Sequence, residues 1–226
     1  MLYRFFHTLL TLIILGVGVG LTWVGVAVDV FPVDKVLQAA QQRYGASAAQ
    51  AVRDWNNVLN LFRGGSEMQR LKDVNEFFNR RLRFVDDQKN WGENDYWATP
   101  IESLTKGAGD CEDYAIAKYF TLKFVGVPVT KLRITYVRAI IGGAGSNISQ
   151  AHMVLTYYPT PDAEPLVLDN LVGEIRPASR RTDLQPIFSF NSEGVYGAGG
   201  VPQPGGGSRI SKWNDLIEKM KAEGIE

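Results

Sequence analysis

Apolar positions recur at helical spacing through the first half of the chain after its leader. Between residues 33 and 62 they lie first on one helical face and then on another, and Gly45 marks the expected break. Ser66 and Gln69 have the pattern of a capping box that opens a further helix to about Leu82. These residues therefore predict a helical scaffold that forms the core.

A third helical pattern begins beside the only cysteine of the chain. Within residues 115–125 the apolar side chains keep helical spacing, and a glycine and a proline follow directly. Asp110, with Asp113 three residues later, is a good N-cap candidate. Cys111 is thus expected in the first turn, where free N–H groups and the helix dipole favour a thiolate.

Alternating and β-branched residues follow, and they predict strands. The three clearest segments are 132–140, 151–158 and 165–169. Residues 159–164 can join the second and third as a hairpin, which would place His152 beside Asp169 at the end of the antiparallel neighbour. The sequence therefore changes from helical to strand patterns after the cysteine helix.

The amino-terminal segment is apolar and uncharged over residues 9–28, with Arg4 before it and Asp29 directly after it. This pattern is typical of an export signal or a membrane anchor. Residues 1–30 are therefore predicted to be a signal peptide or signal anchor that places the following domain outside the cytoplasm, with the positive end inside.

The carboxy-terminal part is rich in glycine and proline before it becomes amphipathic. We expect residues 31–196 to form one domain, residues 197–208 a Gly/Pro linker, and residues 209–226 a segment whose helix docks back on the domain.

Composition supports one folded domain and argues against nucleic-acid binding. The 226 residues are 45% hydrophobic and 21% charged, and the net charge is zero without a basic run. The chain has a single cysteine and only two histidines, of which His7 lies in the leader. The folded part thus pairs one thiol, Cys111, with one imidazole, His152.

This pairing predicts a catalytic triad. A cysteine nucleophile needs a base, and Asp169 is positioned to orient His152. The alternative is a free buried cysteine, a strand histidine and a strand-end aspartate without a common role. Because the folded domain holds no other thiol or imidazole, we favour catalysis by Cys111, His152 and Asp169.

Acidic residues surround the thiol in a way that opposes its ionisation. Asp110, Glu112 and Asp113 should raise the pKa of Cys111 unless a bound cation neutralises them.

Upstream, a polar loop at residues 86–97 carries three aromatic residues that could wall a cleft. The same loop can supply further oxygen ligands for a hard cation, from Asp86, Asp87 and Asp95.

Four segments resemble the bacterial transglutaminase-like cysteine proteinases, in particular the periplasmic LapG-type enzymes. The resemblance rests on Asn94–Pro100, Gly107–Ala115, Ala151–Val154 and Leu168–Asn170, and it spans roughly residues 30 to 190. It implies a papain-like α+β fold and a triad of Cys111, His152 and Asp169. It also implies calcium beside the thiol, with Asp110 and Glu112 matching the calcium-binding acids of the family. Asp113, next to them in sequence, and Asp95, from the 86–97 loop, are further candidate ligands.

The resemblance also implies a substrate and a partner. Family members cut the amino-terminal region of a large surface adhesin at a paired-alanine site in the periplasm and so release biofilm cells. They are held inactive by the periplasmic domain of an inner-membrane cyclic-di-GMP receptor. Two alternatives remain: a transglutaminase, in which an amine resolves the acyl-enzyme, and a catalytically idle binding module, which an intact triad disfavours.

Overall fold

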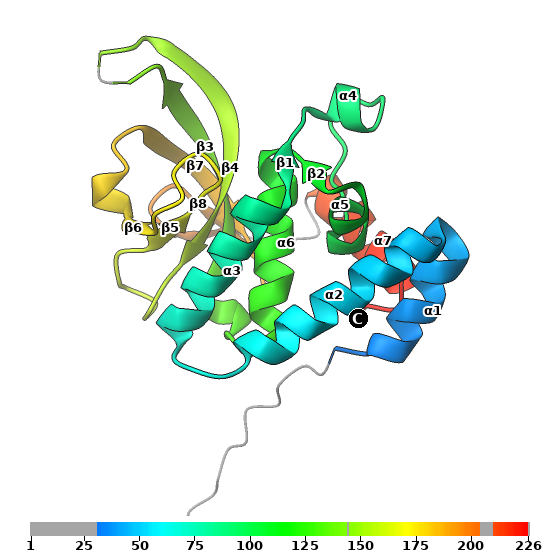
Figure 1. Ribbon diagram of the computed structural model, residues 1–226. Helices are drawn as coiled ribbons and strands as arrows, with labels where there is room; N and C mark the ends of the chain where they lie inside the picture. The colour runs from blue at the N-terminus through cyan, green and yellow to red at the C-terminus, as the bar shows by residue number, and fades with distance from the viewer. Residues whose placement is uncertain (1–30, 144, 204–209, 226) are drawn as a thin grey trace, which may run out of the picture.

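The computed structural model describes residues 31–143, 145–203 and 210–225. Helices dominate its first half and strands most of its second half (Figure 1). The α-helices are α1 (Val33–Tyr44), α2 (Ala46–Phe62), α3 (Glu67–Arg81), α4 (Asp87–Asn90), α5 (Pro100–Lys106), α6 (Cys111–Phe124) and α7 (Ser211–Ala222). Two short 3-10 helices are η1 (Val129–Lys131) and η2 (Ala178–Arg180). The strands are β1 (Arg83–Phe84), β2 (Ala108–Gly109), β3 (Leu132–Ile141), β4 (Ile148–Tyr157), β5 (Leu166–Leu168), β6 (Arg176–Pro177), β7 (Leu184–Phe190), β8 (Val195–Gly197) and β9 (Pro202–Gln203).

The main sheet has the order β6-β5-β4-β3-β7-β8-β9, and each neighbouring pair is antiparallel. The three predicted strands are present as β3, β4 and β5, and the predicted hairpin pairs Leu155 with Leu168. Strands β1 and β2 form a separate parallel pair that leads directly into α6. The α+β prediction is confirmed.

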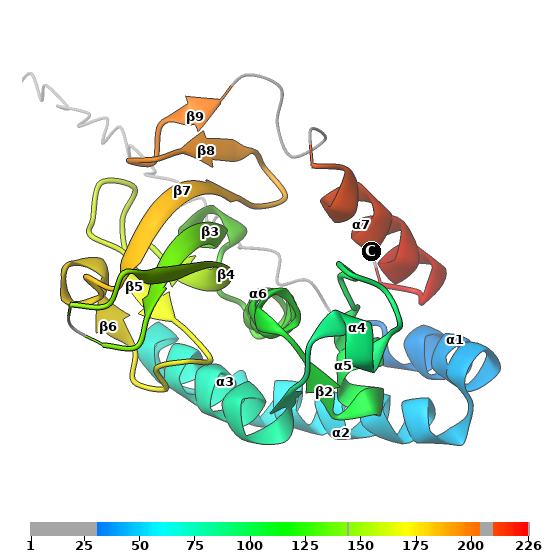
Figure 2. The same cartoon turned by 90° about the horizontal axis from the view of Figure 1, so that it is seen from above.

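Helix α6 lies between the sheet and the amino-terminal helices (Figure 2). It is buried on nearly every side, because it is enclosed between these two layers. Phe31, Trp55 and Phe124 pack edge-to-face against one another, and the Trp55 indole donates a hydrogen bond to Thr121 of α6 at 2.9 Å. These contacts fix the helix that carries the cysteine at its first residue.

The amino-terminal helices follow the expected breaks. Gly45 has a φ of +83°, which favours glycine, and it separates α1 from α2. Ser66 caps α3 by accepting the backbone N–H of Gln69, but the Gln69 side chain donates to Asp73 instead of returning to Ser66. The capping box is therefore only half formed.

The structure differs from the sequence expectation between residues 184 and 203. Strands β7, β8 and β9 extend the sheet there, although the sequence predicted no strands and placed a linker from Gly197 onward. Gly197 and Gly200 belong to the tight connection between β8 and β9, so glycine here signals a turn. The leader prediction and residues 204–209 lie outside the described residues. No helix in the described part of the chain is long and apolar enough to span a membrane.

Helix α7 docks on the domain, as its amphipathic pattern predicted. Trp213, Leu216 and Met220 are buried, and Trp213 stacks on Phe120 of α6 with ring centroids 5.7 Å apart. The same helix also contacts the loop before α5, where Lys219 donates to the Trp97 carbonyl.

Lys118 of α6 is a buried cation without a hydrogen-bond partner in the described residues. It is 1% exposed, and burial lowers its pKa to about 7 despite the attraction of Asp169. An unfolded lysine keeps its proton to about pH 10.4, so the contribution of Lys118 to the stability of the fold should rise with pH from about 7 to 10.

We therefore expect Lys118→Met to raise the free energy of unfolding at pH 7 by about 1–3 kcal/mol and to flatten this rise. Urea unfolding measured across this pH range tests it. The exposed Lys72→Met is the control. A destabilised Lys118→Met protein would contradict the expectation.

Candidate active site

Cys111 is positioned by a helix cap built from Asp113. The Asp113 carboxylate accepts the backbone N–H of Ala98 at 2.8 Å and that of Asp110 at 3.4 Å. A Cβ at residue 109 would lie 2.6 Å from Asp113 Oδ2, so only glycine allows this close approach. The cap holds Cys111 at the point where the β2 backbone becomes α6.

The sheet brings His152 and Asp169 together. His152 lies on β4, Asp169 directly follows β5, and their Nε2 and Oδ1 atoms are 2.8 Å apart. Both side chains are almost completely buried. Because Nε2 faces Asp169, the imidazole keeps its other nitrogen for a second partner.

Asp169 is further held by Arg181, which the sequence analysis missed. Arg181 Nη2 lies 2.7 Å from Asp169 Oδ2, and the N–H of Leu171 donates to Asp169 Oδ1 at 3.1 Å. Burial alone would raise the pKa of Asp169, but His152, Arg181 and this N–H together lower it to about 2. The carboxyl group is therefore an anion throughout the neutral range, able to stabilise an imidazolium.

Cys111 and His152 line one cleft of about 570 Å³. The thiol donates to Glu112 Oε2 at 3.0 Å, and no hydrogen bond joins it to His152 in the residues described. Burial, followed by Glu112 and Asp110, raises the pKa of Cys111. In this arrangement the thiol stays protonated.

The cleft walls come from both layers and include Phe84, Asp95, Trp97, Tyr136, Leu171 and Phe188.

The aromatic residues of the 86–97 loop have separate roles. Trp97 lines the cleft, as expected, and is 8% exposed. Trp91 and Tyr96 instead stack on each other, with ring centroids 4.5 Å apart, and Tyr96 donates to Glu102 of α5. They are not among the cleft residues, so the expectation that all three wall a cleft is wrong for these two.

Carboxylates from two segments gather beside the thiol. In the described residues there are three sets of possible ligand atoms, and the atoms of each set lie within 4.8 Å of one another: Asp110 with Cys111 and Glu112; Asp87 with Asp110 and Asp113; and Asp87 with Asp95 and Glu112. All four acidic residues predicted as ligands are thus close to at least two other candidates. Asp87 belongs to two of these sets, although nothing in the sequence ranks it above its neighbour Asp86.

Of the acidic residues in this cluster, only Asp95 has an ion-pair partner in the described chain, which is Lys212 at 3.4 Å. Asp87 Oδ1 and Asp110 Oδ1 are buried and accept no hydrogen bond, while Asp87 Oδ2 accepts the N–H of Tyr96. Burial, and then repulsion from Glu112, raises the pKa of Asp87 to about 6 and that of Asp110 to about 9. Free buried oxygens among crowded carboxylates are a donor set that suits a hard cation.

Comparison with protein families now places the chain. The model described as "bacterial transglutaminase-like cysteine proteinase BTLCP" matches residues 45–185, which is more than half of the sequence. The chain belongs to the bacterial transglutaminase-like cysteine proteinases. It is a cysteine protease with the fold of that family, as the sequence resemblance implied.

This proteinase is similar to solved structures of LapG from Legionella pneumophila. It is 39% identical to the EGTA-treated form, with a TM-score of 0.72, over 84% of this chain and 98% of that chain. The calcium-bound form gives 39% identity and a TM-score of 0.70 over 84% and 99% of the two chains. The comparison with curated proteins gave no match.

Proposed function

We propose that this proteinase hydrolyses peptide bonds with Cys111 as nucleophile, His152 as base and Asp169 as the group that orients the imidazole. The observation that carries the proposal is the cleft that Cys111 and His152 share, with His152 hydrogen-bonded to a buried, ionised Asp169. These are the three roles that cysteine catalysis requires.

In the proposed reaction His152 acts first as a base and then as an acid. His152 takes the Cys111 proton as the sulfur attacks the scissile carbonyl, and the imidazolium returns a proton to the leaving amine as the C–N bond breaks. Water, deprotonated by His152, cleaves the thioester and restores the thiol. An amine in place of water would make the enzyme a transglutaminase.

We further propose calcium as the cation of the acidic cluster, supported by the calcium-bound form of the similar LapG. Asp87, Asp95, Asp110 and Glu112 would hold it through oxygen atoms, two of which are buried and unpartnered. Asp113 serves chiefly as the helix cap, because backbone N–H groups bind both of its oxygens. A bound calcium ion would neutralise the cluster and compete with the thiol for Glu112, which favours the thiolate.

The proposed substrate is the amino-terminal region of a large surface adhesin, cut in the periplasm to release biofilm cells. The similarity to LapG and the apolar leader at residues 9–28 support this proposal. The leader acts as an export signal or inner-membrane anchor, and the periplasmic domain of an inner-membrane cyclic-di-GMP receptor is the proposed inhibitor.

The test uses the full chain with fragments from the amino-terminal region of a candidate adhesin, in calcium, with a primary amine present. Mass spectrometry should find two products whose masses add up to the mass of the substrate plus one water. The masses should place the cleavage site between the paired alanines. A fragment with that pair replaced by two aspartates is the control. Products carrying the amine would support the transglutaminase, and no product from either fragment would contradict the substrate.

Arg181 is expected to act as a positioning residue for Asp169. Arg181→Met should lower kcat by on the order of 10-fold with little change in KM, since it removes a charge-assisted hydrogen bond outside the cleft. Without Arg181 the pKa of Asp169 rises, so the acidic limb of the pH–kcat profile should move to higher pH.

The adjacent Arg180, which is exposed, gives the matched control, Arg180→Met. Arg181→Lys should restore part of the rate because it keeps the charge. An unchanged pH profile in Arg181→Met would show that the ion pair serves only the fold.

A further inference from the structure

The main sheet has a second cavity on the face turned away from α6. Side chains alternate along a strand, so Ile134 and Leu155 join the main core while Val137 and Val154 point to the other side. A cavity of about 520 Å³ lies over these valines. Of the described residues, Phe188 alone lines both this cavity and the cleft of Cys111. The cavity is large enough for a small molecule.

One end of this cavity holds a buried cation without a counterion. Arg133 is 8% exposed, and its guanidinium lies 4.3 Å from the ring centroid of Tyr158 and 3.7 Å from that of Tyr196. It takes part in none of the ion pairs of the described residues, and its buried Nε has no acceptor there. Asp162, an exposed carboxylate that lines the cavity, makes no ion pair with it. A buried charge without a counterion is costly, and an anion beside Arg133 would relieve that cost.

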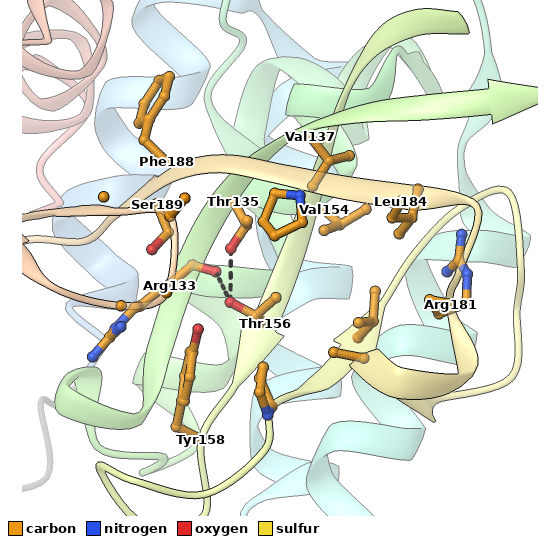
Figure 3. A pocket seen from close by; sticks show the side chains of 18 of the residues that line it. Arg133, Thr135, Val137, Val154, Thr156, Tyr158, Arg181, Leu184, Phe188 and Ser189 are labelled. Carbon is orange, nitrogen blue, oxygen red and sulfur yellow. Dashed lines mark hydrogen bonds between the residues drawn. The ribbon is translucent and has the colours of Figure 1, made fainter. Parts of the chain in front are cut away.

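The rest of the cavity changes from polar to apolar (Figure 3). Thr135 and Thr156 lie next to Arg133 and hydrogen-bond to each other at 2.8 Å, and Ser189 is close by. Beyond them the floor is formed by Val137 and Val154. Such a gradient fits a molecule with one charged end and an apolar body.

The far end of the cavity is closed by a second arginine. Arg181 binds Asp169 and Asp183 through Nη2, and its buried Nη1 has no acceptor in the described residues. Because two carboxylates already compensate its charge, Arg181 offers a hydrogen-bond donor and Arg133 offers the unpaired charge.

We propose that this cavity binds a small amphipathic organic anion, with its anionic head against Arg133 and its apolar body along Val137 and Val154. The head is a carboxylate or a phosphate ester. Each of these groups has two oxygen atoms that can accept a pair of hydrogen bonds from a guanidinium. The proposal concerns a site on the opposite face of the sheet and does not depend on the protease mechanism.

The experiment measures the Arg Nε–H and valine methyl NMR signals of the full chain during titration. Hexanoate and hexyl phosphate are the probes, and hexanol and inorganic phosphate are the controls that lack the head or the body. We expect saturable shifts at Arg133 and at the cavity valines for at least one probe, with a Kd at or below about 1 mM. Binding of hexanol and of inorganic phosphate should be at least about 10-fold weaker, since each lacks one of the two contacts.

Variants separate a binding site from a purely structural stack. Arg133→Gln and Ala178→Leu, which narrows the cavity from its wall, should each weaken probe binding at least about 10-fold. The exposed Arg138→Gln on the same strand should bind as the wild type does. If Arg133→Gln does not fold, Ala178→Leu still provides the test.

Three results would overturn the proposal. They are the absence of saturation by either probe up to about 10 mM, hexanol binding as tight as that of the probes, and unchanged binding in folded variants of the cavity. The first would leave the Arg133 stack as a tether for the β8–β9 hairpin. The second would mean that the cavity is apolar without an anion site.

Discussion

Replacing Cys111 with alanine is expected to abolish proteolysis while the protein remains folded, and His152→Ala should do the same. Each replacement removes a member of a unit that works only when complete, so kcat should fall by on the order of 10⁴- to 10⁶-fold. The double variant should be no slower than either single one. The measurement is kcat/KM on an adhesin fragment with calcium in excess, together with thermal unfolding.

Asp169→Asn separates orientation from proton transfer. It keeps the shape of the side chain but removes the charge that the imidazole faces at 2.8 Å, and we expect a loss on the order of 10⁴-fold. Cleavage at the wild-type rate by Cys111→Ala protein would exclude the thiol as nucleophile. A large loss of unfolding temperature in all three variants would instead indicate a structural role.

Removal of calcium is expected to have the second large effect. Chelator in excess should lower the cleavage rate by at least on the order of 100-fold, because the thiol then faces uncompensated carboxylates, and added calcium should restore the rate. At a free calcium concentration 100 times the Kd, calcium binding would also contribute about 2.7 kcal/mol to the stability of the fold.

Calcium removal should also change how the stability of the fold depends on pH. Without calcium, Asp87 and Asp110 have pKa values of about 6 and about 9, whereas in the unfolded chain both lose their protons near pH 4. At these two carboxyl groups the folded state therefore holds more protons, and their contribution to its stability should fall as pH rises from about 4 to 9. Calcium binds the ionised carboxylates and should oppose this fall.

Matched variants assign the ligands. Asp87→Asn, Asp110→Ala and Glu112→Ala should each weaken calcium binding, measured by calorimetry, whereas Asp86→Asn changes the exposed neighbour and should not. Full activity in excess chelator, an unchanged unfolding temperature and wild-type behaviour of these variants would together remove calcium from the mechanism.

Local patterns predicted the parts of the site that depend on nearby residues. The Asp110–Asp113 spacing at the start of α6 and the short hairpin between β4 and β5 involve few residues, so Cys111, His152 and Asp169 could be placed from sequence. The same holds for helix α7, whose apolar face is periodic.

The missed features depend on contacts that spacing does not encode. Arg181 follows a 3-10 turn without periodicity, and only the folded sheet brings it to Asp169. Asp86 and Asp87 are alike in sequence, but the turn at α4 buries the second and leaves the first exposed. In β7, Pro186 interrupts the pattern that would otherwise identify a strand.

One wall of the cleft is braced by helix α7, which is synthesised after the residues of the triad. Lys212 pairs with Asp95 at 3.4 Å and Lys219 donates to the carbonyl of Trp97, across separations of 117 and 122 positions. A nascent chain that has emerged as far as β9 already carries the thiol, the imidazole and their carboxylate, but it lacks the helix that braces this wall. We therefore expect the cleft to be completed late in folding, after the ribosome has released these lysines, so that an unfinished polypeptide has its nucleophile well before it has an assembled substrate cleft.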